Sequence, residues 1–366
     1  MKTNQERKIL EPMTLRKTVI RNRAVFPPVT CIGMTPQNGV PGADRLDHYT
    51  KIAETGMGII ILEACCVRPD ARLHPDQLGL WDDMQIDGLS TIVSGIRQKG
   101  VACIIQIHHA GARTHPEINS VPVVPSVFKT DDGKRVRVAS TAELSIIRDN
   151  FIDAAIRAEK AGADGVELHG AHNYLLSEMA SPVFNQRTDA YGGNQQKRLR
   201  LALEIIEGIR ATTGQNFILG YRMGGNEPTY IEGIRIAKIL EDAGVDFLHV
   251  SYGYPRPDDE SASVCPDFDY NSVVYGASLI KQSVRMPVIA VNRIQTLTRG
   301  EWLLRNGHAD MIAYARPVLA DYEFFRRSIS GQDKSDCLLC SPRCFWYTDS
   351  RLCPARRLVK KARRDF

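Results

Sequence analysis

Three side chains that can hold and protonate a carbonyl compound lie close together in the sequence. His169, His172 and Tyr174 follow an apolar run that ends at Leu168. Two imidazoles can donate hydrogen bonds to one carbonyl oxygen, and a phenol can give a proton to a nearby carbon. A single buried histidine is more often structural than catalytic, but the tight grouping favours joint action on one substrate.

Four cysteines near the carboxyl terminus form a second group with chemical potential. Their spacing is Cys337-x2-Cys340-x3-Cys344-x8-Cys353, and Pro354 follows directly. Four thiolates are the usual ligands of a 4Fe–4S cluster, and three close cysteines with a separated fourth are common in such sites. A structural zinc ion accepts the same ligands, so spacing alone leaves the two interpretations nearly equal.

A repeated pattern predicts the elements that position these residues. A glycine at a helix end is followed by a short apolar strand at residues 54–62, 99–106, 161–168, 243–250 and 306–313. Residues 24–29, 217–222 and 287–291 add three strands. The runs are apolar without alternation, as expected of parallel strands buried on both faces. Helical patterns lie between them at 141–160, 198–212, 231–242 and 272–284.

Eight alternating units predict an α/β fold, the (β/α)8 TIM barrel. A doubly wound sheet would show a similar pattern, but it usually carries a glycine fingerprint after its first strand. Neither Gly-x-Gly-x-x-Gly nor the phosphate-loop motif occurs in this chain. Barrel chemistry lies where strands end, and the unusual residues follow predicted strand ends, including Glu63 and the adjacent pair His108 and His109. We expect one of these two histidines to line the site.

The motifs resemble the old yellow enzyme family of FMN-dependent oxidoreductases over roughly residues 10–327. The similar blocks occur in the family's order, at residues 22–30, 106–111, 169–174, 292–294 and 315–317. The last two blocks, with the cysteine tail, look most like the iron–sulfur branch. That branch includes 2,4-dienoyl-CoA reductase and trimethylamine dehydrogenase, although its last cysteine gap is longer.

The resemblance implies a flavin-binding role for ten residues. Those expected along the isoalloxazine ring are Pro28, Val29, Thr30 and Ala64. Gln106 would hydrogen-bond the pyrimidine edge, and Arg222 would stabilise the reduced anionic flavin near N1 and O2. Those expected at the FMN phosphate are Asn292, Arg293, Ala315 and Arg316.

The resemblance also implies a reaction, the reduction of an alkene conjugated to a carbonyl or thioester. His169 and His172 would grip the activating oxygen of this small-molecule substrate. Hydride would pass from flavin N5 to the β-carbon, and Tyr174 would protonate the α-carbon.

Two parts of the chain are expected, residues 1–330 as the FMN-binding barrel and residues 331–366 as a cluster-binding tail with a basic end. A position after a flavin barrel favours the 4Fe–4S cluster over zinc. Larger family members continue into nucleotide-binding domains, whereas this sequence contains no dinucleotide fingerprint. We therefore expect electrons from NAD(P)H or from a separate redox protein through the cluster.

Two other functions fit the same residues. The barrel could oxidise an amine and pass electrons out through the cluster. A quaternary-ammonium substrate would need aromatic walls, for which Tyr252, Tyr254 and Tyr270 are candidates, although loop packing explains these residues equally well. It could also be an electron-transfer subunit without its own substrate, but the retention of His169, His172 and Tyr174 argues against this function. Arg256, beside Asp258, Asp259 and Glu260, is poor support for a CoA-binding mouth.

The distribution of charge and hydropathy bears on partners and location. The formal charge is +5, and six positive charges come from Arg356, Arg357, Lys360, Lys361, Arg363 and Arg364, which leaves 5 − 6 = −1 for the remainder. A short basic tail could touch nucleic acid, an anionic lipid surface or an acidic partner, but solvated charge is the better interpretation, and no nucleic-acid partner is expected. Residues 1–10 lack the apolar core of a secretory signal, and no apolar run is long enough to span a membrane, so a cytoplasmic location without a membrane partner follows. A homo-oligomer is compatible with the sequence.

Overall fold

The computed structural model describes residues 7–34, 36, 38–130, 133–254, 264–265, 267–341 and 343–362. Some residues discussed above lie outside these ranges, namely Arg256, Asp258, Asp259, Glu260, Arg363 and Arg364.

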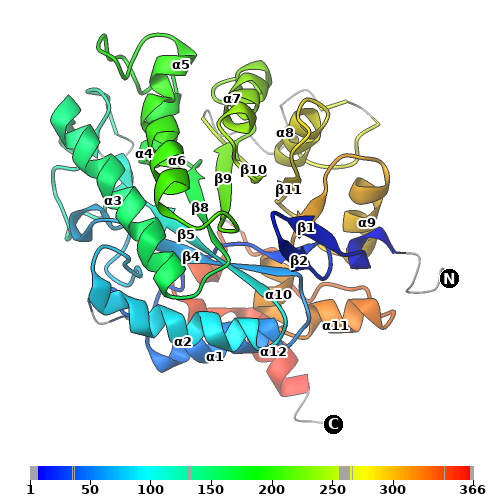
Figure 1. The fold of residues 1–366 in the computed structure, drawn as a ribbon. Coiled ribbons are helices and arrows are strands. Elements are labelled where there is room, and N and C mark those ends of the chain that lie inside the picture. The colour runs from blue at the N-terminus through cyan, green and yellow to red at the C-terminus, as the bar shows by residue number, and fades with distance from the viewer. Residues whose placement is uncertain are drawn as a thin grey trace.

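Eight parallel strands close into a barrel in chain order (Figure 1). They are β3 (Ala24–Phe26), β4 (Ile59–Cys66), β5 (Ala102–His108), β8 (Gly165–Gly170), β9 (Ile218–Gly224), β10 (Phe247–Ser251), β11 (Val288–Ala290) and β12 (Met311–Ala313). Every residue of these strands is buried, because the barrel interior covers one face and the surrounding helices cover the other. The predicted TIM barrel and all eight predicted strand positions are confirmed.

Helices form a ring around the strands (Figure 1). The longer ones are α1 (Ala43–Ala53), α2 (Ile86–Arg97), α3 (Thr141–Lys160), α6 (Arg200–Thr212), α7 (Tyr230–Asp242), α8 (Ser272–Lys281) and α9 (Leu297–Arg305). Gly56, Gly100, Gly162, Gly244 and Gly307 all have positive φ after a helix, as their pattern predicts. The predicted helix 272–284 ends earlier, at Lys281, because the last residues turn toward β11.

A hairpin closes one end of the barrel. Its strands, β1 (Met13–Leu15) and β2 (Thr18–Ile20), pair antiparallel. Leu15 and Ile20 join a separate apolar cluster that includes Ile59, Ile104 and Ile218 near the strand starts. The amino-terminal end is therefore sealed by packed side chains, and polar chemistry is confined to the carboxyl-terminal end of the strands.

The cysteine tail folds back onto that carboxyl-terminal end. The indole ring of Trp346 in the tail is buried, and its Nε1 donates to the Thr30 carbonyl oxygen at 3.0 Å. The Ser350 amide donates to the Ile32 carbonyl at 2.7 Å. The final helix α12 (Pro354–Ala362) contacts α10 (Arg316–Ala320). The tail thus packs against the carboxyl-terminal end of the barrel strands. No helix in the described ranges is long and apolar enough to cross a membrane.

Candidate active site

The predicted histidine pair and tyrosine come together at the end of β8. His169 lies on the strand, and the chain then turns sharply, with positive φ at His172 (64°) and Asn173 (56°). Asparagine and histidine are among the residues that tolerate this left-handed conformation best. Tyr174 precedes helix α4 (Leu175–Ala180), and its ring centroid is 4.7 Å from that of His169. The turn brings all three side chains into contact with one another.

A hydrogen-bonded chain links the two histidines to Ser251 at the end of β10. His172 Nδ1 lies 3.3 Å from His169 Nε2, and His172 Nε2 lies 2.6 Å from Ser251 Oγ. The Ala171 amide donates to His169 Nδ1 at 3.4 Å. With neutral rings, this pattern places the proton on Nε2 of both histidines. Ser251, which sequence reasoning missed, then accepts from His172.

Burial keeps both imidazoles neutral. It is the main cause that lowers the pKa of His169 well below its usual value, with a further contribution from the neighbouring His172. Burial also lowers the pKa of His172, and the charge of Arg222 adds to the effect. The two rings therefore act as neutral hydrogen-bond donors, because protonation would place uncompensated charge beside a buried guanidinium.

Of the adjacent pair, His108 lines the site and His109 does not. The His108 ring is 4.4 Å from the Tyr174 ring, and its Nδ1 lies 3.0 Å from Gln77 Nε2. Because Gln77 Nε2 is a donor, the His108 proton is on Nε2, which has no partner among the described residues. His109 instead accepts from the Gly111 amide. Burial lowers the pKa of each to about 3.

Gln106 is held by a buried carboxylate that sequence reasoning did not identify. Its Nε2 donates to Glu167 Oε1 at 2.7 Å, and Glu167 Oε2 lies 2.9 Å from His249 Nδ1. These side chains rise from β5, β8 and β10, each two residues before a site residue, and strand residues i and i+2 share a face. The amide of Gln106 is therefore oriented, with its oxygen left to accept a hydrogen bond.

Arg222 reaches the same space from β9. One terminal nitrogen is 3.4 Å from Ser251 Oγ, whereas the Nε atom is buried and has no partner among the described residues. Burial lowers the pKa of the guanidinium, and Glu167 opposes the change, so the group stays charged. A buried cation with an unused donor is suited to an anionic ligand.

The loop after β3 is organised by a buried ion pair. Glu63 accepts from the Cys31 amide at 3.0 Å and from Arg45 Nε at 2.9 Å, and both charged side chains are fully buried. Arg45 also donates to the carbonyl oxygens of Met34, Cys31 and Asp76. Pro28 and Val29 are buried within this loop, Ala64 is buried beside Glu63, and Thr30 is half-buried. The ion pair thus fixes the wall predicted to face the ring.

The residues expected at the phosphate follow two paired strands, β11 and β12. Asn292 and Arg293 have positive φ of 106° and 53°. The Asn271 side chain donates to the Asn292 carbonyl at 3.3 Å. Ala315 precedes α10, and Arg316 begins it. Arg316 also stands at the wall of the cysteine cavity, which is a position that the sequence did not predict.

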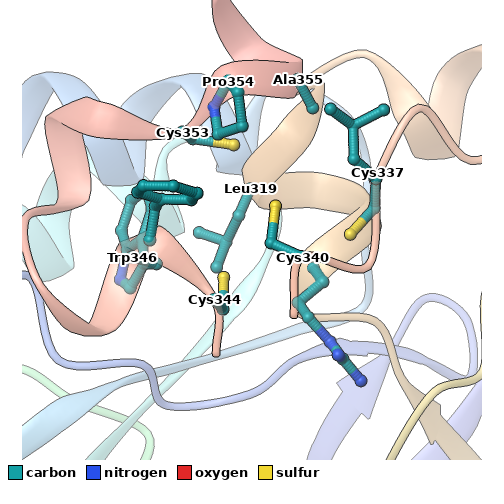
Figure 2. Close-up of a pocket in the computed structure, with 11 residues that line it drawn as sticks. Leu319, Cys337, Cys340, Cys344, Trp346, Cys353, Pro354 and Ala355 are labelled. Carbon is teal, nitrogen blue, oxygen red and sulfur yellow. The ribbon is translucent and has the colours of Figure 1, made fainter. Parts of the chain in front are cut away.

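All four tail cysteines line one cavity (Figure 2). Its other walls include Leu319, Trp346 and Ala355, so the surroundings are mainly apolar. Burial raises the pKa of the thiols of Cys337 and Cys344. Among the described residues, no group of three or more His, Cys, Asp or Glu side chains is arranged to hold a single metal ion. The four cysteines thus line the same cavity, and their role as cluster ligands stays a prediction.

The three tyrosines considered as aromatic walls for an amine have different neighbours. The Tyr252 ring is 4.4 Å from His172, and Tyr254 packs on Phe184. Tyr270 lies elsewhere, with its hydroxyl donating to the Arg299 carbonyl and its ring 5.5 Å from Trp302. Tyr270 therefore packs against α9, in agreement with the packing alternative rather than with a role in a cage.

Known proteins show strong similarity to this chain. Residues 8–334 match the NADH:flavin oxidoreductase / NADH oxidase family. An NADH oxidase of Thermoanaerobacter brockii is 36% identical over 340 residues, 89% of this chain and 52% of that protein. An NADPH dehydrogenase of Bacillus licheniformis is 33% identical over 321 residues, 86% of this chain and 92% of that protein. The chain thus spans about half of the first relative and most of the second.

Solved structures share the fold. A 2-naphthoyl-CoA reductase in complex with 2-naphthoyl-CoA has a TM-score of 0.84 at 22% identity, with coverage of 93% of this chain and 56% of that one. An old yellow enzyme homologue from Zymomonas mobilis has a TM-score of 0.77 at 25% identity, with coverage of 93% and 96%. The predicted family resemblance is confirmed, whereas the resemblance to its iron–sulfur branch stays a prediction.

Proposed function

Because the chain belongs to the NADH:flavin oxidoreductase / NADH oxidase family, we propose that it is an FMN-dependent reductase of alkenes conjugated to a carbonyl or thioester. The observation that carries this proposal is the grouping of His169, His172 and Tyr174 beside the buried cation Arg222. Two neutral donors, a phenol and a fixed positive charge are the groups that such a reduction requires.

The substrate oxygen would be held by the two histidines. The ring protons are on Nε2 of His169 and of His172. In the structure His169 Nε2 donates to His172 Nδ1, and His172 Nε2 donates to Ser251 Oγ. A carbonyl oxygen entering the space would replace those acceptors and receive both hydrogen bonds. As charge develops on that oxygen, the two donors stabilise it more strongly than they stabilise the ground state.

Tyr174 would supply the proton for the α-carbon. Burial raises the pKa of its hydroxyl well above the usual value, so the phenol is protonated throughout the neutral range. Its ring lies against His169 and His108, which restricts its position beside the carbonyl-binding space. A fixed, protonated donor next to the polarised alkene is the arrangement expected of a general acid.

The site residues fit an FMN molecule. The buried Nε of Arg222 lacks a partner, and the oriented amide of Gln106 leaves an oxygen acceptor. The ring would lie along Pro28, Val29, Thr30 and Ala64, and the phosphate would lie near Asn292, Arg293, Ala315 and Arg316. When bound, the flavin would supply the hydride. NADH and NADPH are candidate reductants, because the two relatives are an NADH oxidase and an NADPH dehydrogenase.

The tail cysteines would hold a 4Fe–4S cluster that passes electrons to the site. Support comes from the four cysteines around one apolar cavity and from the direct contact of the tail with the Thr30 loop. Zinc is the alternative occupant, because it takes the same ligands. Anaerobic purification with metal analysis and visible absorption separates the two, since only the cluster gives both iron and a broad thiolate-to-iron band.

One anaerobic experiment tests the proposed function. The FMN-loaded protein is reduced with NADPH and mixed with an enone, an enoyl thioester or a methylamine. Reoxidation of the flavin by the unsaturated compounds supports the proposal. Bleaching of the oxidised flavin by the amine would instead establish amine dehydrogenation, and no response to any compound would indicate an electron-transfer subunit.

A further inference from the structure

The tail carries large apolar side chains that remain exposed around the cysteine cavity. Leu338, Phe345 and Leu358 are 55%, 48% and 59% exposed. Leu338 and Phe345 line the cavity, and Leu358 lies on α12, which begins directly after Cys353. An exposed apolar group of this kind often marks a site of interaction. We call the exposed surface of residues 337–362 the tail face, and these three side chains are its apolar part.

The basic part of the tail face is formed by Arg343, Arg357, Lys360 and Lys361. Residues 337–362 contain six arginines and lysines and one acidic residue, Asp349. Asp349 is paired with Arg351 at 2.6 Å. The four basic residues are exposed, and none of them forms an ion pair with another described residue. The tail therefore exposes apolar side chains at the cavity and basic side chains within the same short stretch of chain.

Arg356 is the basic residue of α12 that packs against the barrel. It points inward, donates to the Leu319 carbonyl at 2.9 Å and lies over the rings of Tyr322 and Trp346. The buried Ala355 anchors the same side of α12. Arg357, Lys360 and Lys361 occupy the opposite, exposed side of the helix. Packing accounts for one side of α12 and leaves the basic side without an internal role.

We propose that the tail face docks a small acidic electron-transfer protein. This inference rests on the proposed function, in which electrons enter through the cysteine tail. The partner's acidic residues would meet the basic part, and its apolar edge would meet the apolar part. Encounters between redox proteins use small interfaces, and opposite charges raise their association rate. Reduction of one double bond takes two electrons and two protons, so two reduced one-electron partners are oxidised per substrate.

A second copy of the chain is a poor occupant of this face. A two-fold symmetric contact would place the same basic residues, including Arg357 and Lys360, against one another. Such like-charge contacts cost free energy that the few apolar side chains would have to offset. An anionic membrane and a nucleic acid would also attract the positive charge, and they are therefore included as outcomes of the test.

Binding is measured by titration calorimetry with the full chain and an oxidised acidic bacterial ferredoxin at low and high salt. We expect saturable binding that weakens with salt. Lys360→Glu with Lys361→Glu should weaken it by about tenfold or more, which corresponds to about 1.4 kcal/mol. Leu358→Ser should weaken it as well. The matched control is Lys197→Glu with Lys238→Glu on α5 (Gln195–Arg198) and α7, away from α12 (Figure 1), and it should change the affinity by less than about twofold.

Several results would overturn the inference. Absence of saturable binding, or equal weakening by the control pair, would show that the tail face is not the docking site. Tighter binding to phosphatidylglycerol vesicles or to duplex DNA than to the ferredoxin would assign the face to a membrane or a nucleic acid. Flavin reoxidation by alkenes is measured separately, so loss of docking with retained alkene reduction contradicts only this inference.

Discussion

Trp346 donates a hydrogen bond from its indole nitrogen to the carbonyl oxygen of Thr30 at 3.0 Å, although the two residues are 316 positions apart. Trp346 lies between two of the tail cysteines, and Thr30 lies in the loop predicted to face the flavin. The contact therefore joins the cysteine cavity to the barrel site through one buried side chain. A displacement of the tail would shift the loop that contains Thr30, because protein interiors are tightly packed.

Trp346→Phe should weaken this connection. The ring is retained, but the Thr30 carbonyl loses its donor, and an unsatisfied buried group costs about 1–3 kcal/mol. We expect lower stability in urea and weaker FMN binding, as measured by fluorescence quenching. Phe345→Leu, at a half-exposed neighbour, is the control and should change stability by less than about 0.5 kcal/mol. Unchanged FMN affinity in Trp346→Phe would contradict the proposed coupling.

Tyr174→Phe should slow alkene reduction while it preserves flavin binding. Loss of a positioned general acid typically costs about 10²–10⁴-fold in rate. Reduction of the flavin by NADPH should be unaffected, and stopped-flow absorbance follows both half-reactions separately. Tyr270→Phe removes a hydroxyl that donates only to a distant backbone carbonyl, so its alkene kinetics should match the unmodified protein. Unchanged alkene kinetics in Tyr174→Phe would remove this residue from the proton-donor role.

Ser251→Ala should disturb the histidine chain. The hydroxyl accepts from His172 at 2.6 Å and from Arg222 at 3.4 Å, so its removal leaves both groups less well oriented. We expect kcat/KM for alkenes to fall by about tenfold, the equivalent of one lost hydrogen bond of about 1.4 kcal/mol. Ser283→Ala, which removes a hydroxyl bonded only within its helix end, should leave kcat/KM unchanged. An equal fall in both variants would exclude a specific role for Ser251.

Glu63→Gln should destabilise the protein far more than a surface substitution. It leaves the Arg45 guanidinium buried without its counter-charge, and breaking such a pair costs about 3–5 kcal/mol. Glu54→Gln breaks the half-exposed pair with Lys99, which should cost less than about 1 kcal/mol. Chemical denaturation measures both free energies of unfolding. Similar small losses in the two variants would show that the buried pair does not support the Thr30 loop.

Glu178 should make stability depend on pH. Burial raises the pKa of its carboxyl to about 8 in the folded protein, above the usual value of about 4.5. The folded state therefore keeps a proton that the unfolded state releases, and stability falls as pH rises from about 4.5 to about 8 and then levels off. Glu178→Gln keeps an acceptor for the Ala112 amide and removes this proton.

Thermal unfolding followed from pH 5 to pH 8.5 checks this prediction. We expect Glu178→Gln to gain stability relative to the unmodified protein as pH rises, by a few kcal/mol at most between the two ends. The exposed Glu207→Gln is the control and should show the same pH dependence as the unmodified protein. Parallel curves for Glu178→Gln would mean that this carboxyl titrates alike in both states.

The fold and much of the site could be predicted because their signals are local. Five of the eight barrel strands follow a glycine with positive φ, such as Gly162 before β8, and this pattern is visible in a few consecutive residues. His169, His172 and Tyr174 belong to one turn, so their proximity also follows from the sequence. The sequence pattern extends the helix to residue 284, whereas α8 ends at Lys281, because the residues after Lys281 have helical composition but lead into the next strand.

The sequence by itself determined the order of strands, the residues with catalytic potential and the positions of the four cysteines, since neighbouring residues carry this information. Only the tertiary structure decided that His108 rather than His109 lines the site, that Ser251 joins the histidine chain and that Tyr270 lies apart. It also decided that Trp346 contacts Thr30. These relationships depend on which distant segments share a buried space. Burial then sets their chemistry, because a group removed from water must find its partner within the protein.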